Sequence, residues 1–284
     1  MSWRPAGRDS SRRLIRILKV DEWMHAALAS RLKTSGGIAR FGQISDGRLW
    51  VHEAAGRIDG GLFISRFGIV LPAYDESTIP GRDSDFLTTL YRSRRDRLFS
   101  IIGMENRVLD VETHLGEKPP DYESYRMFTR DYSSVKEKPI PPGITLLKAG
   151  PGDVNLLWPL ERSYQKEEVL RPGSHLDEKH GRRFFLNTLK NQEVYYAAMN
   201  GTPVAKAGTN ARGWNYDQIG GVFVDHALRG QGFGRMIMER LLDAIRTDGR
   251  RPCLFVKKSN KAALQLYKSL DFRDRGAFRI SYWI

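Results

Sequence analysis

A helical period marks the segment from residue 235 to residue 248. Its apolar residues share one helical face and recur at three- or four-residue intervals: Ile237, Met238, Leu241, Leu242 and Ile245. Charged residues occupy the opposite face. The short apolar run GGVFV at 220–224 comes before this segment and is typical of a buried strand. The two patterns predict a strand and a helix that are joined by the glycine-rich residues 229–234.

Strand and helix periods alternate in the same way through both halves of the chain. In the second half we predict helices over 151–170, 181–190, 235–248 and 261–270. The strands predicted there cover 194–199, 203–211, 217–224, 253–256 and 278–283. In the first half the predicted helices cover 21–33, 84–93 and 105–115, and the strands 48–54, 61–66, 68–74, 98–103 and 125–131. Because the elements follow one another in one order, the chain is predicted to contain an internal repeat.

A connector between the two halves is predicted over residues 133–144. Its sequence, SSVKEKPIPPGI, holds three prolines and a glycine among charged residues, which neither a helix nor a central strand tolerates. We therefore predict one domain over residues 1–142 and a second over residues 143–284. Nothing in the first half resembles the glycine-rich run of the second.

Composition limits the class of protein. Of the 284 residues, 40% are hydrophobic and 28% are charged, as in ordinary globular chains, and no apolar run has the roughly 18 residues that a membrane span needs. The single cysteine, Cys253, excludes an internal disulfide and a cysteine-built zinc site. We expect a cytoplasmic protein that does not bind membranes. No spacing of histidines and carboxylates predicts a metal site.

The run RGQGFG at 229–234 has the features of an anion-binding loop. It lies at the start of a predicted helix, where backbone amides lack intrahelical partners and the helix dipole is positive. Glycines let those amides approach an anion closely. The spacing differs from the dinucleotide fingerprint and from the P-loop, which needs Gly-Lys followed by Ser or Thr. A pyrophosphate is the expected ligand, and a tight turn that binds nothing is the alternative.

Two segments together resemble a known family. VFVDHALRGQGFGRMIMERLL is similar to the acyl-CoA-binding motif of the GNAT acyltransferase superfamily, with Arg229, Gly232 and Gly234 at the motif positions. About thirty residues later, SNKAALQLYKSLDF is similar to a second GNAT motif. Its matching residues are Asn260, Ala263, Leu266, Tyr267 and Phe272. The family usually has glycine where this chain has Asp271. A helix often ends there in the left-handed conformation, which glycine adopts with least strain and Asp tolerates.

The resemblance covers residues 144–284 well and implies a mixed α/β sheet. The whole chain more weakly resembles bacterial two-domain GNAT proteins whose N-terminal half is uncharacterised. We therefore expect two GNAT-like domains: a degenerate, non-catalytic domain over residues 1–142 and a complete catalytic domain over residues 143–284.

The same resemblance implies transfer of an acetyl group from acetyl-CoA to an amine by direct attack on the thioester. The cofactor's pyrophosphate would lie on the amides of Arg229, Gly230, Gln231, Gly232, Phe233, Gly234 and Arg235. Its pantetheine arm would pair with the backbone of Val222, Phe223 and Val224 and hydrogen-bond to Asn260. Tyr267 matches the family tyrosine that protonates the departing thiolate, and core packing is its alternative role.

The general base is less directly implied. Some members use a glutamate on the strand before the loop, but this chain has Gln218 there, which cannot accept the proton. Glu168 and Glu167 lie in the segment that lines the acceptor site in the superfamily, so they are the candidate bases. A solvated role for both, Asp217 on the same strand and a chain of waters remain alternatives.

Other functions are compatible with the same sequence. A CoA-binding sensor or scaffold without transferase activity would also need the glycine loop. The net charge of +13, with the basic stretch YRSRRDRLF at 91–99, raises binding to nucleic acid, although no recognised module is present and we do not expect it. The acceptor, a small molecule or a protein, and the oligomeric state are not determined by the sequence.

Overall fold

The structure is a computed structural model of the chain. It describes residues 2–35, 42–44, 46–74, 81–93, 97–131, 139–171 and 173–283. Half of the connector predicted over 133–144, and the centre of the basic stretch 91–99, therefore lie outside the described residues. The same holds for residues 75–80, which follow the predicted strand 68–74.

The first half of the chain contains seven strands among the described residues. They are β1 (Ser2–Pro5), β2 (Gln43–Ile44), β3 (Gly47–Ala54), β4 (Arg57–Ser65), β5 (Ile69–Ala73), β6 (Ser100–Met104) and β7 (Asp121–Thr129). Its α-helices are α1 (Arg8–Leu18), α2 (Ala26–Thr34), α3 (Gly81–Arg92) and α4 (Glu105–Leu115), with a 3₁₀ turn at Glu22–His25 before α2.

The second half follows the same plan. Its strands are β8 (Ile144–Lys148), β9 (Val194–Met199), β10 (Thr202–Arg212), β11 (Tyr216–Val224), β12 (Arg251–Lys257) and β13 (Arg273–Tyr282). Its α-helices are α5 (Val154–Tyr164), α6 (Glu178–Asn191), α7 (Phe233–Thr247) and α8 (Lys261–Ser269). A π-helical turn, Gln165–Val169, extends α5. 3₁₀ turns at Pro151–Asp153 and His226–Leu228 complete the described elements.

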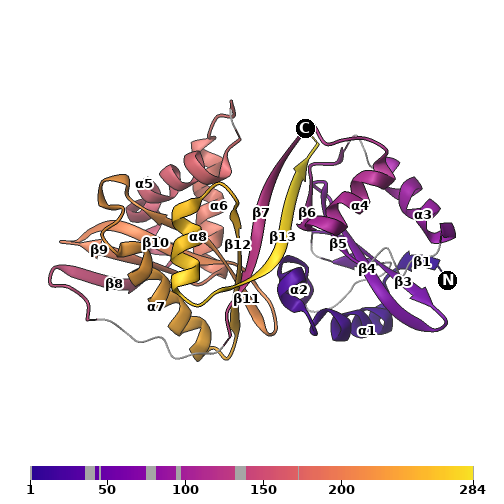
Figure 1. The fold of residues 1–284 in the computed structure, drawn as a ribbon, viewed down its shortest axis with the longest axis horizontal. Coiled ribbons are helices and arrows are strands. Elements are labelled where there is room, and N and C mark those ends of the chain that lie inside the picture. The colour runs from indigo at the N-terminus through magenta and orange to yellow at the C-terminus, as the bar shows by residue number, and fades with distance from the viewer. Residues whose placement is uncertain are drawn as a thin grey trace.

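All strands belong to one sheet that spans both halves (Figure 1). Its order is β1-β3-β4-β5-β6-β13-β7-β12-β11-β10-β9-β8, and β2 pairs with β3. The order is symmetric about the central pair of β13 and β7. Each half has one parallel pair, β5 with β6 and β11 with β12, and the other described pairs are antiparallel. This mixed α/β architecture confirms the predicted fold class.

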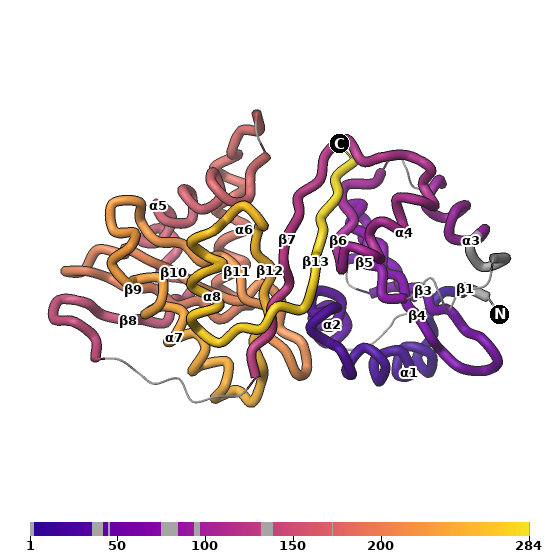
Figure 2. The backbone as a smooth tube through the Cα atoms, in the orientation of Figure 1, coloured from indigo at the N-terminus to yellow at the C-terminus, as the bar shows by residue number. Residues whose placement is uncertain are grey.

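The two halves exchange strands at the centre of the sheet. β7, from the first half, pairs with β12 of the second half, and β13, from the end of the chain, pairs with β6 of the first half. The two exchanged strands also pair with each other from Arg273↔Thr129 to Tyr282↔Asp121. Figure 2 shows both running between the halves. The division of the chain at residue 142 therefore does not coincide with a break in the sheet.

Helices cover both faces of the sheet in each half. Along β9 the side chains alternate, so Tyr195 and Ala197 pack in the core under α7 and α8, whereas Tyr196 and Ala198 pack with α5 and α6. The apolar face predicted for residues 235–248 is buried in the first of these cores. In the first half, α3 and α4 cover one face and α1 and α2 the other. A helix–sheet–helix sandwich results on each side of the exchanged strands.

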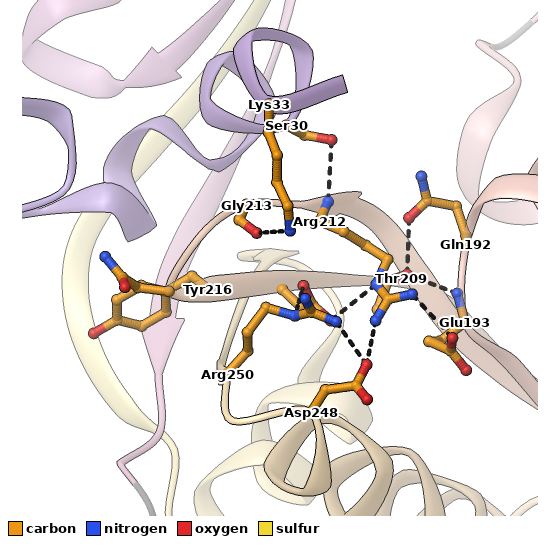
Figure 3. A network of polar contacts seen from close by, with 12 residues as sticks. Ser30, Lys33, Gln192, Glu193, Thr209, Arg212, Gly213, Tyr216, Asp248 and Arg250 are labelled. Atoms are coloured by element: carbon orange, nitrogen blue, oxygen red, sulfur yellow. Dashed lines mark hydrogen bonds and ion pairs between the residues drawn. The ribbon is translucent and has the colours of Figure 1, made fainter. Parts of the chain in front are cut away.

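Polar contacts also tie α2 to the second half (Figure 3). Lys33 Nζ donates to the Gly213 carbonyl at 2.5 Å, and the backbone N–H of Arg212 donates to the Ser30 hydroxyl at 3.1 Å. Just before α2, the buried Glu22 carboxylate accepts from the backbone amides of Asn215 and Tyr216. The turn between β10 and β11 is thus held by the first half of the chain.

The structure adds some elements that the sequence patterns did not predict. Strands β1, β2 and β8 and helix α1 were missed, and the helix predicted over 21–33 is a 3₁₀ turn followed by α2. The helix predicted over 151–170 is three successive helical forms, with the π turn at its end. Asp271 has φ of +61°, so it takes the left-handed conformation expected after the last helix.

Candidate functional site

A gap opens in the sheet where β11 diverges from β12. Their pairing runs only from Tyr216↔Arg251 to Gln218↔Cys253. A bulge in β11 accompanies the divergence: four residues, from Gly220 to Phe223, lie opposite three on β10, from Gly208 to Lys206. Gly221 in this bulge has φ of +64°, which glycine adopts without strain. The last residues of β11, Val222–Val224, are left unpaired on the β12 side and line a groove there.

A buried ion pair contacts the backbone of the bulge. Lys206 Nζ donates to the Gly221 carbonyl at 2.8 Å and lies 2.9 Å from Glu161 Oε2. Both charged side chains are almost fully buried, and the ammonium lies 4.3 Å from the centre of the Tyr164 ring. The contact gives the extra carbonyl of the bulge a partner away from solvent.

The glycine loop lies between β11 and α7, as predicted. Gly230 and Gly232 have φ of +78° and +88°, and Gly232 is the N-cap of α7 without a side-chain capping bond. The first-turn amides of α7 are therefore not capped by a side chain. Open space surrounds the position of a Cβ atom on either glycine. Such a helix start can accept an anion.

A groove of about 740 Å³ runs along this loop and between β11 and α8. Most residues predicted to bind the cofactor line it: Val222, Phe223, Val224, Arg229, Gly230, Gly232, Phe233, Gly234, Arg235 and Asn260. Glu167 and Glu168 line it as well. Gln231 and Tyr267, which were predicted with them, are not part of its lining. The Gln231 amide donates to the Ala227 carbonyl instead.

Glu167 is held by two basic side chains of the loop region. Arg229 Nη2 donates to its carboxylate at 2.8 Å, and His226 Nε2 lies 3.0 Å from the same oxygen. The hydrogen bond from Arg229 holds the pKa of Glu167 below its usual value. The Arg229 guanidinium also lies over the Phe223 ring. Arg229 thus connects the glycine loop with the π turn that carries both glutamates.

Glu168 has a different environment. Asn260 Nδ2 donates to Glu168 Oε1 at 3.1 Å, and Lys257 Nζ lies 3.5 Å from Oε2. Asn260 is also the N-cap of α8, where its side-chain oxygen accepts from the Ala263 amide at 3.0 Å. The amide predicted to contact the cofactor therefore positions a candidate base and starts a helix.

Tyr267 lies on α8 in the core below the groove. Its side chain is buried, and its ring makes an edge contact with Phe272 at 5.8 Å between centroids. Burial raises the pKa of the hydroxyl, with smaller contributions from Tyr164 and Glu168. The phenol is therefore protonated at neutral pH, which a proton donor requires.

Asp217, the alternative base on β11, lies away from the groove. It is fully buried, with Arg250 Nε 2.9 Å and Arg212 Nε 3.2 Å from its carboxylate oxygens. Burial nevertheless raises its pKa. Asp217 belongs to an ion-pair network at the end of β11 that pairs with β12. It therefore lies apart from Glu167 and Glu168, the other candidate bases.

A second cavity, of about 770 Å³, lies beyond the two glutamates. It shares Glu167, Glu168 and Lys257 with the groove. Its other walls come from the turn after α5 and from the exchanged strands, including Asp121, Glu123, Tyr125 and Tyr282. The sequence patterns missed these residues, because only the exchange of β7 and β13 brings them beside α5.

Two features are absent from the described residues. Within them, no three histidine, cysteine or acidic side chains are grouped as a metal site would need. No described helix combines the length and apolarity of a bilayer span.

Comparisons with solved structures show the same fold. A Drosophila protein superposes with a TM-score of 0.65 at 12% identity, covering 99% of this chain and 98% of that one. A tandem GNAT protein from the clavulanic acid biosynthesis pathway gives 0.60 at 13% identity, with the same coverages. A GCN5-related N-acetyltransferase from Kribbella flavida gives 0.54 at 14% identity, covering 90% and 95%.

The sequence comparison is more specific for the second half of the chain. No curated protein matches the sequence. Residues 157–272, which contain the groove, the glycine loop and both candidate motifs, match the acetyltransferase (GNAT) family. This match identifies residues 157–272 as a GNAT acetyltransferase domain, and the fold of the whole chain is similar to that of the solved structures above.

Proposed function

We propose that this chain is an N-acetyltransferase that uses acetyl-CoA and acts on an amine. One observation carries the proposal: the groove beside the glycine loop and the second cavity meet at Glu167, Glu168 and Lys257. Two reactants that enter from opposite sides would meet at this junction. The match of residues 157–272 to an acetyltransferase family supports the same reaction class.

The residues of the groove fit the chemical groups of the cofactor, which supplies a thioester-bound acetyl group. Amides of the glycine loop and of the start of α7 would hold the pyrophosphate, and Arg229 would add a positive charge. The unpaired backbone of Val222–Val224 would bind the peptide-like arm, as a neighbouring strand would.

Glu168 at the junction and Tyr267 on α8 would carry out the proton transfers. Glu168 would take a proton from the amine, and Tyr267 would give one to the departing sulfur. Glu167 is the weaker candidate base because Arg229 lowers its pKa. These assignments rest on position and on the motif of α8.

Binding and turnover test the proposal separately. Calorimetry should show binding of acetyl-CoA to the purified protein, and release of CoA thiol should depend on added amine. Cys253 will not disturb that thiol assay, because its side chain is buried and burial raises its pKa well above the ordinary value. Absence of acetyl-CoA binding contradicts the proposal. Binding without turnover across a broad set of amines would instead favour a CoA-binding sensor.

A further inference from the structure

We propose that the acceptor is an amine with a second positive charge, which Glu123 on β7 binds about 7 Å from the reacting nitrogen. The inference rests on the transferase function proposed above and adds the class of substrate. The inference gives β7, a strand from the first half of the chain, a role in substrate binding.

Four residues of the strand β7 line the second cavity, and Tyr122 is one of them. Asp121, Glu123 and Tyr125 alternate along the strand and therefore share one face. On the neighbouring β13, Tyr282 lies opposite Asp121, Ile280 opposite Glu123 and Phe278 opposite Tyr125. Glu123 is thus a carboxylate between two tyrosines and opposite a buried isoleucine.

Most charges around this cavity are already paired. Asp121 pairs with Arg171 at 2.7 Å, and Glu178 pairs with Arg162. At the junction, Glu168 forms an ion pair with Lys257, and Glu167 forms one with Arg229.

Glu123 differs from the other lining carboxylates. Its Oε1 accepts from the backbone amide of Ser124 at 3.2 Å, and it forms no ion pair with a residue that the structure describes. Lys166 and His175, the remaining basic lining residues, are exposed on the helical side of the cavity. A carboxylate next to apolar and aromatic groups is costly unless a cation accompanies it, and tyrosine rings also attract cations. The environment of Glu123 therefore fits a cationic ligand.

The register of β7 gives the distance between the reacting nitrogen and the charge that Glu123 would bind. Tyr125 lies opposite Lys257, which lines both cavities, so Tyr125 marks the junction where the amine would react. Glu123 lies two residues further along the strand, a distance of about 7 Å. 1,4-Diaminobutane and 1,5-diaminopentane have nitrogen spacings on the order of 6 to 8 Å when extended. A short diamine therefore spans the two positions.

A second charge is needed for selectivity because the reacting nitrogen must be neutral when it attacks. The attraction between the protonated reacting nitrogen and a carboxylate is lost when that nitrogen gives up its proton. This attraction therefore does not lower the barrier to acetyl transfer. A second ammonium stays charged throughout and remains bound in the transition state. Glu123 is thus expected to act as a specificity-determining residue rather than as the base.

Matched substrates test this selectivity. The measurement is kcat/KM for 1,4-diaminobutane and 1,5-diaminopentane against 1-aminobutane and 4-amino-1-butanol, with acetyl-CoA as donor. The unchanged protein should prefer the diamines by about tenfold to a hundredfold, the range for a hydrogen bond between charged groups. In Glu123→Gln the ratio should fall towards one, mainly through a higher KM for the diamines.

Control variants separate recognition from folding. Asp131→Asn removes a carboxylate just beyond the other end of β7, where it pairs with Arg273 in solvent, and should keep the diamine preference. Glu123→Asp keeps the charge but shortens its reach, so its ratio should be intermediate. Each variant's affinity for acetyl-CoA, measured by calorimetry, reports whether the groove is intact.

The outcomes are distinguishable. If the protein acetylates monoamines as well as diamines, or if Glu123→Gln keeps the preference, the inference is wrong and the transferase proposal stands. If acetyl-CoA does not bind, or if none of the amines and no other acceptor is acetylated, the transferase proposal fails and this inference fails with it.

Discussion

Glu167 and Glu168 are neighbours in the chain, but their side chains have different partners. Glu167 is tied to Arg229 and His226, whereas Glu168 contacts Asn260 and Lys257. The π turn that carries them places both at the junction of the two cavities. Because Arg229 lowers the pKa of Glu167, that carboxylate stays ionised as the pH falls below 4.5 and is a weak base.

This difference predicts unequal effects of removing the two charges. Glu168→Gln should lower kcat by about a hundredfold, the usual contribution of a general base. Glu167→Gln should lower kcat less, because Arg229 lowers the pKa of Glu167 and makes it a weaker base. Steady-state rates of the two variants at one pH provide the comparison. The reverse pattern would make Glu167 the base.

Tyr267 offers a second test at the level of one atom. Tyr267→Phe removes only the hydroxyl and keeps the ring that packs on Phe272. If the phenol protonates the departing sulfur, kcat should fall by about a hundredfold to ten-thousandfold, while the affinity for acetyl-CoA stays the same. Unchanged turnover would leave Tyr267 a purely structural residue. Thermal unfolding of the variant checks that the core is intact.

At the scale of elements, the opening in the sheet depends on one bulge. The extra residue at Gly221 turns β11 away from β12, and its carbonyl is held by Lys206, which Glu161 neutralises. The site therefore depends on a charge pair that does not line the groove.

Removing this pair stepwise separates stability from binding. Lys206→Met leaves the buried Glu161 carboxylate without its partner and should destabilise the fold by about 3–5 kcal/mol in denaturant titration. Adding Glu161→Leu should recover most of that loss, because no unpaired charge remains. The double variant should still bind acetyl-CoA more weakly, since the Gly221 carbonyl lacks its donor. Full recovery of affinity would show that the bulge does not need Lys206.

Local elements were largely predictable from the sequence because they follow from local patterns. The helical face of Ile237 and Leu241, the strand GGVFV and the glycine loop between them lie where their periodicity indicated. The site was predictable only in part. Motif spacing found the groove, but nothing near Glu123 or Tyr125 in the sequence marks them as part of a cavity, because their neighbours there come from residues 162–178, 257 and 282.

For the whole molecule, the exchanged strands make the halves interdependent. β7 completes the sheet of the second half and β13 extends that of the first. Glu22 and Lys33 add contacts from the first half to the turn between β10 and β11.

Cutting the connector tests this interdependence. A protease site inserted between residues 133 and 142 should allow cleavage into two fragments that still migrate together in gel filtration without denaturant. The backbone pairing of β7 with β12 and β13 would hold them. Denaturing electrophoresis confirms that the cut is complete, and the protein with the site left uncut serves as the control. Fragments that separate in native buffer would contradict the strand exchange.

The sequence by itself determined most of the elements, the internal repeat and the two motifs beside the groove, because hydrophobic periods and helix-start signals act over a few residues. Tertiary structure alone decided which strands pair at the centre of the sheet and hence which residues face the two glutamates. Those pairings join residues 121–129 to 253–257 and 273–282. Pairing over such separations depends on the packing of the whole sheet, and no local pattern encodes it.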